Sequence, residues 1–360
     1  MRRNHIDNLR WMCIMLLFPF HIFMVYNSFG EGFYVKGADI KASTMFLFAI
    51  WPWFMPILFA VAGISASYAL QKRSVGEYAR EMVSKLLVPL VAGILLVIPA
   101  QTYFAERFHN GYTGGYFAQY ILFFTKPTDL TGYTGGFTPG HLWFILYLLV
   151  ISFAAIPVVL LCRRLKSKPR PGRAPLPGRM PMPAILGLFI LPVLGALVLD
   201  IGGKSLGEYF AWFMLGYFVL SDEDVQEKLE KGRAPLLAAG LLCMAFAALQ
   251  GYGALAAPYP LPGIFQRFCG WAVILALVGL SRKHLDVRDR FTGYMSRSSF
   301  AVYLFHQTWV VASAYFALKI TGNAVVQMWL ILVLSVAATF LSYEICRRFK
   351  ATRFLFAIKE

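Results

Sequence analysis

The residues of this sequence best suited to chemistry are two histidines that lie inside apolar segments. An arginine precedes each of them. His21 follows Arg10 by eleven residues in the first apolar segment, and His306 follows Arg297 by nine in the ninth. Ionisable groups within apolar spans are costly, so each is a candidate functional group. At 1.5 Å per helical residue, the two histidines lie about 16 Å and about 13 Å beyond their arginines. This matched depth predicts one polar cavity, with arginines that bind an anion at its rim.

The neighbours of these groups extend the candidate site. Asp7 precedes Arg10 by three residues, so the two can pair on one helical face. Ser299, Tyr303 and His306 share a face through their i, i+4, i+7 spacing. Two non-catalytic interpretations remain open. Arg10 can be a charge that sets membrane orientation, and the histidines can be structural hydrogen-bonding groups within a helix bundle.

Two further polar residues lie near segment ends. His141 opens the fourth apolar segment, where we expect it at the outer rim in an interfacial role. Glu344 lies just before Arg347 and Arg348, so a local ion pair is its simplest interpretation.

The composition indicates a membrane solvent for the elements that carry these residues. Hydrophobic residues make up 58% of the 360 residues and charged residues only 14%, against roughly 25% charged in soluble domains. This excludes an ordinary soluble enzyme, a disordered chain and a disulfide scaffold. The five cysteines form no C-x-x-C pair, so we interpret them as small buried hydrophobes and predict no metal site.

The hydropathy pattern predicts an all-α polytopic membrane protein with about ten transmembrane helices in a single domain, residues 1–360. Each helix is an apolar segment long enough, or nearly so, to cross a bilayer. The segments are 10–30, 44–70, 84–105, 141–162, 183–201, 207–220, 234–256, 264–281, 297–318 and 324–346. The fifth and sixth are separated only by a turn at Gly202-Gly203.

The basic residues behind the net charge of +16 lie mainly in the connecting segments, so this charge does not indicate nucleic-acid binding. If the N-terminus is cytoplasmic and the spans alternate, 27 of the 34 Lys and Arg residues fall on the cytoplasmic side and 7 outside. Such an excess sets membrane orientation. Both termini are therefore predicted to be cytoplasmic.

Two connecting segments are longer than a turn. Residues 163–183 are rich in Pro and Arg and are expected to form a flexible cytoplasmic linker. Residues 106–140 form an outer loop that contains Gly-Tyr-Thr-Gly-Gly twice, with an aromatic stretch at 116–124 between the copies. We expect a short helix lying in the membrane interface there. Stacking of its rings on sugar faces is the alternative.

Several of these elements together resemble the integral membrane acyltransferase family 3. Asp7 to Arg10, with His21 eleven residues after Arg10, looks like its R-x10-H signature. The resemblance continues in order through Lys85 to Pro89, His141 to Phe144 and Ser299 to His306. The pattern around His21 is most similar to the members of this family that modify glucans.

The resemblance implies an acyl transfer across the membrane, from cytoplasmic acyl-CoA (succinyl-CoA or acetyl-CoA) to a carbohydrate hydroxyl outside. No bound cofactor is implied, because acyl-CoA is a substrate. The partners expected are acyl-CoA, a carbohydrate acceptor such as a periplasmic glucan, and membrane lipid, in a bacterial inner membrane. The roles fall into three groups. The catalytic residues are His21, His306 and Tyr303, the donor-binding residues are Arg10, Arg80, Lys85 and Arg297, and the supporting residues are Asp7, Ser299, His141, Trp143 and Glu344.

His21 is expected to act as general base or to carry the acyl group itself. Tyr303 or His306 is expected to orient His21 or to stabilise the oxyanion. The sequence departs from the family at Glu344, which lacks the proline that often follows soon after, and at Arg80 and Lys85, where two close arginines are usual.

A transporter or flippase for a glycan or a lipid-linked intermediate is the competing interpretation. A proton-coupled carrier places carboxylates within its spans. Here Asp200, Glu208 and Glu344 all lie near segment ends, which favours an enzyme.

Overall fold

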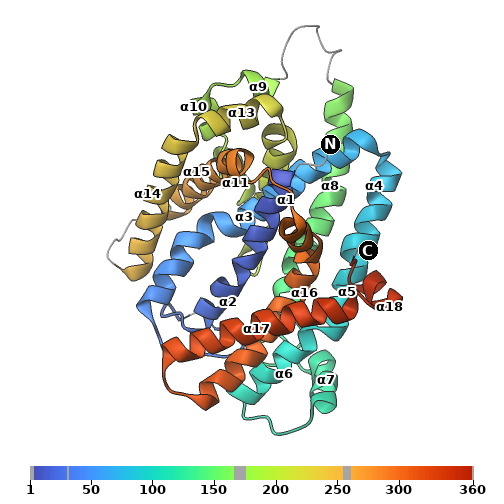
Figure 1. Cartoon of the computed structure of the whole chain (residues 1–360), viewed down its shortest axis with the longest axis vertical. Coiled ribbons are helices and arrows are strands. Elements are labelled where there is room, and N and C mark those ends of the chain that lie inside the picture. The colour runs from blue at the N-terminus through green and yellow to red at the C-terminus, as the bar shows by residue number, and fades with distance from the viewer. Residues whose placement is uncertain (1–3, 31, 166–175, 254–260, 359–360) are drawn as a thin grey trace. The chain divides into compact units, whose positions relative to one another are not determined.

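The computed structural model describes residues 4–30, 32–165, 176–253 and 261–358 (Figure 1). Helices dominate this part of the chain. Its regular strands are β1 (Asp200–Ile201) and β2 (Lys204–Ser205), which form one antiparallel hairpin. Gly202 and Gly203 connect them at φ values of 59° and 75°, a region that favours glycine. The predicted turn and the all-α class are both confirmed.

The chain divides into two compact units that alternate along the sequence. The first comprises residues 1–10, 48–83 and 147–292, and the second comprises residues 11–47, 84–146 and 293–360. The prediction of a single domain stays a prediction.

The first unit is built mainly from helices that pack in pairs, among them α14 beside α15 (Figure 1). The helices that lie wholly or mostly within it are α3 (Lys41–Lys72), α4 (Val75–Met82), α8 (Trp143–Leu165), α9 (Leu176–Arg179), α10 (Met182–Gly187), α11 (Ile190–Gly195), α12 (Leu206–Leu215), η3 (Gly216–Leu220), α13 (Glu223–Lys231), α14 (Arg233–Tyr252) and α15 (Leu261–His284). Glycine allows α3 and η3 to approach closely, since a Cβ at Gly216 would lie 2.0 Å from the carbonyl oxygen of Ala60. Such backbone contact is typical of small residues in membrane helices.

The second unit carries most of the polar residues singled out by the sequence. The helices that lie wholly or mostly within it are α2 (Leu17–Val25), η1 (Val83–Leu87), α5 (Val88–Leu96), α6 (Ile98–His109), α7 (Tyr116–Thr125), η2 (Gly140–Leu142), α16 (Arg290–Ile320), α17 (Ala324–Cys346) and α18 (Lys350–Leu355). Helix α1 (Asn4–Met15) precedes α2, and the two are separated at Leu16. Pro19 lacks the N–H that would bond to the carbonyl of Met15, which accounts for a break at this point.

Seven helical stretches of the described chain are long and apolar enough to cross a membrane. They are Asn4–Val25, Lys41–Lys72, Val75–His109, Gly140–Leu165, Arg233–Gln250, Gly263–His284 and Ala324–Cys346. The other three predicted segments are also helical. Two form the shorter apolar helices Met182–Gly195 and Leu206–Leu220, and the third forms the 31-residue α16, which carries polar residues along its length. The chain is therefore polytopic, and the predicted total of ten spans stays a prediction.

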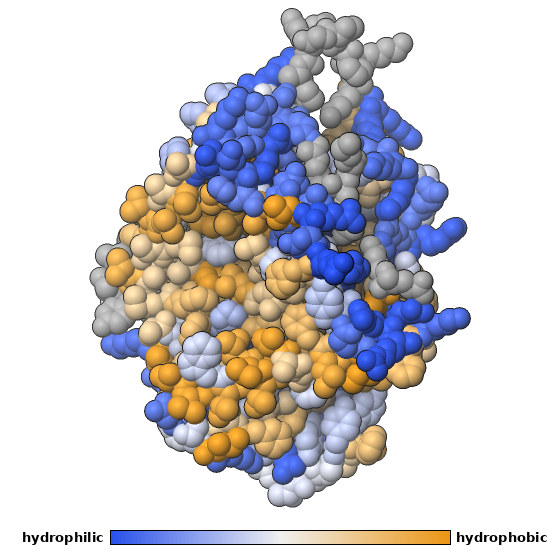
Figure 2. Space-filling view, viewed as in Figure 1, coloured by the Kyte–Doolittle hydropathy of each residue, from blue (hydrophilic) through white to orange (hydrophobic). Residues whose placement is uncertain are grey.

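The surface of the first unit separates hydrophobic from charged helices. In Figure 2 the face of α14 is mostly hydrophobic and the region of α13 is hydrophilic. Leu241 and Leu242 of α14 are more than half exposed, as expected for side chains that face lipid. Residues 166–175 of the predicted linker lie outside the described residues.

The short helix predicted within residues 106–140 is present as α7. One side of it is buried, since Gln119 and Phe123 are fully enclosed, whereas Phe117 and Ile121 on the other side are 83% and 63% exposed. Gln119 donates hydrogen bonds to Thr102 Oγ1 and to the carbonyl of Gly135. The helix is thus fixed to α6 and to the following loop, and it presents an apolar stripe outward.

Candidate active site

Three histidines from distant parts of the sequence form one cluster within the second unit. The rings of His21 and His306 have their centroids 5.2 Å apart, and those of His141 and His306 are 5.1 Å apart. His306 is fully enclosed, His141 is buried, and His21 is half-buried. The structure thus brings together the two histidines expected to share a cavity and adds a third.

Helix α16 positions His306 through its own backbone. The ring nitrogen Nδ1 of His306 lies 2.7 Å from the carbonyl oxygen of Tyr303, one turn earlier. A carbonyl only accepts, so Nδ1 carries the proton and the neutral ring has its lone pair on Nε2. That Nε2 is buried and has no hydrogen-bond partner among the described residues.

Tyr303 supports the cluster from the side of His141. Its hydroxyl donates a hydrogen bond to the backbone carbonyl of His141, and the two rings meet edge to face at 5.5 Å. The expectation that Tyr303 orients His21 or stabilises an oxyanion stays a prediction. The hydroxyl is already engaged in joining η2 to α16, which is a positioning role.

His141 is held at both ring nitrogens, and its expected place at an outer rim stays a prediction. Nε2 lies 3.1 Å from the carbonyl oxygen of Leu304, so it is the protonated nitrogen. Nδ1 then accepts from the Nε2 amide of Gln101 at 3.3 Å. The same amide donates to Thr308 Oγ1 at 2.8 Å. The buried imidazole is therefore neutral and locked in one tautomer.

His21 differs from the other two because part of its ring remains accessible. Phe33 stacks on it at 5.9 Å, with 15° between the ring planes, and Phe20 meets it edge-on. Its Nδ1 is buried without a hydrogen-bond partner. The half-buried ring therefore offers Nε2 on its accessible side.

Arg10 lies in the first unit, where two neighbours fix its guanidinium. It forms an ion pair with Asp7 at 3.1 Å, as the i, i+3 spacing predicts, and donates to Ser65 Oγ at 2.6 Å. The side chain is still 34% exposed. It can therefore accept a further anionic partner.

The remaining basic residues predicted to bind a donor lie at or near the surface of their helices. Arg80 in α4 and Arg297 in α16 are exposed, and Lys85 in η1 is half-buried.

Three supporting residues have local roles. Ser299 Oγ donates to the carbonyl of Ser296 in its own helix at 3.1 Å, and half-buried Trp143 is the first residue of α8. Glu344 pairs with Arg347 at 2.8 Å and accepts from the Tyr294 hydroxyl at 2.9 Å. The expected local ion pair of Glu344 is present, and these contacts are structural.

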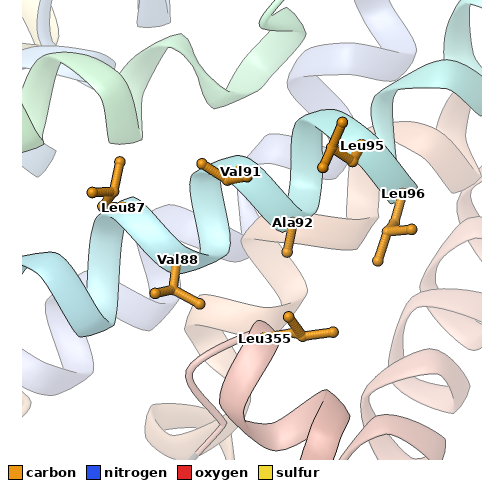
Figure 3. A pocket seen from close by; sticks show the side chains of 7 residues that line it. All are labelled: Leu87, Val88, Val91, Ala92, Leu95, Leu96 and Leu355. Carbon is orange, nitrogen blue, oxygen red and sulfur yellow. The ribbon is translucent and has the colours of Figure 1, made fainter.

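Apart from the histidine cluster, the second unit contains an apolar pocket of about 350 Å³ (Figure 3). Figure 3 shows only aliphatic side chains around it. They are Leu87, Val88, Val91, Ala92, Leu95, Leu96 and Leu355. Such a lining suits hydrocarbon and supplies no reactive group. Within the described residues, no group of three or more His, Cys, Asp or Glu side chains is arranged to hold a metal ion.

Two site residues went unrecognised in the sequence. Gln101 donates one of the two hydrogen bonds that fix the His141 ring, and Phe33 stacks on His21. A glutamine within an apolar stretch was a usable signal for Gln101, because buried amides need partners. Nothing in the sequence distinguishes Phe33 from the other aromatic residues of its segment.

Comparison with known proteins agrees with the earlier resemblance. Residues 3–344 match the family model described as an acyltransferase domain. Glucans biosynthesis protein C of Salmonella schwarzengrund is 24% identical over 381 residues, which cover 99% of this chain and 95% of that protein. The proteins of the same name from Salmonella paratyphi B and Salmonella gallinarum are 23% and 24% identical over the same shares. No solved structure matches the chain. With seven apolar helices and a domain match over nearly its whole length, the chain belongs to the membrane acyltransferase family 3 and is a multi-pass membrane protein.

Proposed function

We propose that this protein transfers a succinyl or acetyl group from cytoplasmic acyl-CoA to a carbohydrate hydroxyl on the outer side of a bacterial inner membrane. The observation that carries the proposal is the half-buried ring of His21 beside the enclosed ring of His306. An imidazole with one buried and one accessible nitrogen suits proton transfer. The name of the Salmonella relatives supports a glucan as the acceptor.

The direct route has His21 as general base. It takes the proton of the acceptor hydroxyl while the oxygen attacks the thioester carbonyl. The new C–O ester bond forms, the C–S bond breaks, and CoA leaves as a thiolate that takes up a proton. In the second route the imidazole attacks the thioester first, and an acyl-histidine then passes the group to the hydroxyl.

Donor binding in this proposal depends on the basic residues at the cytoplasmic side. Arg10 is pre-oriented by Asp7 and Ser65 and remains partly exposed. A planar guanidinium binds phosphate through paired charge-assisted hydrogen bonds. Arg80, Lys85 and Arg297 would add positive charge for the remaining phosphates of acyl-CoA.

The arrangement of the carboxylates gives no support to a carrier. Glu208 forms an ion pair with Arg267 at 2.5 Å, and Glu344 pairs with Arg347. A carboxylate that carries protons must alternate between charged and neutral forms, and a fixed cationic partner opposes this.

The test is acyl-CoA turnover by the purified protein in nanodiscs. Free CoA is measured with succinyl-CoA and with acetyl-CoA, with and without glucan oligomers. The variant is His21→Ala, and the matched control is His284→Ala, because His284 is exposed and lies outside the cluster. We expect acceptor-dependent CoA release that disappears in His21→Ala and persists in His284→Ala. A folded protein that releases no CoA with either donor would contradict the proposal and lead to flux assays for a flippase.

A further inference from the structure

Two buried imidazole nitrogens without a hydrogen-bond partner belong to adjacent rings. They are Nδ1 of His21 and Nε2 of His306, on rings whose centroids are 5.2 Å apart. A buried polar atom without a partner costs free energy, so a pair of them in one place calls for an explanation. The structure describes no hydrogen bond between these two nitrogens, and a turn of the His21 ring that brought them within hydrogen-bond distance would let one shared proton satisfy both.

The direction of such a hydrogen bond follows from the fixed tautomer of His306. Its Nδ1–H donates to the carbonyl of Tyr303, so the neutral ring can only accept at Nε2. The proton between the rings must then come from His21, as Nδ1–H. The lone pair of His21 is left on Nε2, the nitrogen on the accessible side of the ring.

Three donors of the histidine cluster already have hydrogen-bond acceptors. The N–H of His141 donates to Leu304, and the hydroxyl of Tyr303 donates to the carbonyl of His141. The amide of Gln101 donates to His141 and to Thr308. None of these donors is available for the lone pair of His306, and the adjacent ring of His21 carries the other buried imidazole nitrogen without a partner.

His306 itself has little freedom to turn away. Its Nδ1–H is bonded to the backbone, its ring meets His141 at 81°, and Phe18 meets it edge-on at 5.8 Å. A residue fixed in this way can orient a neighbour at no further entropic cost during reaction.

We infer that His306 is a positioning residue that holds His21 as the Nδ1–H tautomer and thereby makes His21 Nε2 the reacting nitrogen. This inference rests on the proposed role of His21 in acyl transfer. When Nε2 takes the hydroxyl proton, the resulting imidazolium keeps its Nδ1–H directed at the lone pair of His306. In the acyl-histidine route, Nε2 carries the acyl group and the same Nδ1–H remains in place. A base oriented by a third group is a general device of nucleophilic catalysis.

Nitrogen NMR of histidine labelled with ¹⁵N tests the tautomer independently of activity. The His21 signals are assigned by their loss in His21→Ala. In the native protein we expect a protonated Nδ1 and an unprotonated Nε2 on His21. His306→Leu removes the acceptor, so we expect mixed tautomers of His21. His306→Gln keeps an acceptor oxygen and should preserve the native tautomer.

Kinetics of the same two variants provide the second readout. We expect His306→Leu to lower kcat at least about 100-fold, within the range for a lost acid–base contribution, and His306→Gln to recover most of that loss. A His21 with its proton on Nε2 in the native protein would overturn the inference, as would an unchanged tautomer in His306→Leu. If His306→Leu fails to fold, the native spectrum and His306→Gln still decide the question. If NMR shows the expected tautomer of His21 but the protein transfers no acyl group, the proposed function is refuted and the positioning of His21 by His306 still holds.

Discussion

Replacement of Lys126 by methionine should open the loop at residues 126–138. Lys126 forms an ion pair with Glu106, whose side chain is only 5% exposed, and it also donates to the carbonyl of Thr134 at 2.6 Å. The Lys126→Met change leaves the Glu106 carboxylate buried, with Asn110 at 2.9 Å as its remaining donor. Removing one partner of a buried pair costs about 3–5 kcal/mol. Since Lys126 is 34% exposed, we expect the low end, about 3 kcal/mol.

Hydrogen–deuterium exchange measures this cost directly, because amide exchange reports the free energy of local opening. A loss of about 3 kcal/mol corresponds to roughly 100-fold faster exchange, at tenfold for each 1.4 kcal/mol. The double variant Lys126→Met with Glu106→Gln removes the buried charge and keeps an acceptor for Asn110. It should return exchange of the loop to within about tenfold of the native rate, since a neutral hydrogen bond is worth about 1 kcal/mol. Equal exchange in the native protein and Lys126→Met would refute the reasoning. So would a double variant that exchanges as fast as the single one.

Three further predictions concern the cluster and the helix contacts. Gln101→Met should lower CoA release about tenfold or more by freeing His141, whereas the control Gln119→Met, also at a fully buried glutamine, should lower it less. Equal losses in the two variants would contradict a specific role of Gln101. Gly216→Ala should lower the yield of folded protein because the added methyl meets backbone at 2.0 Å, while Gly76→Ala, with nothing within 4 Å, should leave chromatographic behaviour unchanged. Asn8→Ala removes two hydrogen bonds to backbone carbonyls, at 2.7 and 2.8 Å, and should destabilise the first unit by about 1–3 kcal/mol, which thermal unfolding would show as a lower midpoint. An unchanged midpoint would show that these two hydrogen bonds add nothing to the stability of the protein.

The sequence alone determined the local structure of this protein: its long helices, its short-range ion pair and its glycine turn. Apolar runs predicted the long helices because a bilayer requires about 20 apolar residues per span. Spacing of i, i+3 predicted the Asp7–Arg10 ion pair, since helix geometry alone places such residues on one face. Two adjacent glycines predicted the turn at 202–203, because only glycine adopts its backbone angles readily.

Tertiary structure decided how the candidate site is assembled. His21, His141 and His306 are far apart in sequence, and no helical period relates them; only the packing of α2, η2 and α16 brings their rings together. The same holds for Gln101, whose amide reaches His141 from α6. Helical periodicity fixes which side chains share a face, but it does not fix which face meets which neighbour. For that reason the sequence identified two of the three clustered histidines as candidate catalytic residues and placed the third at a rim. The hydrogen bonds of the three rings, and with them the tautomers, became visible only in the folded chain.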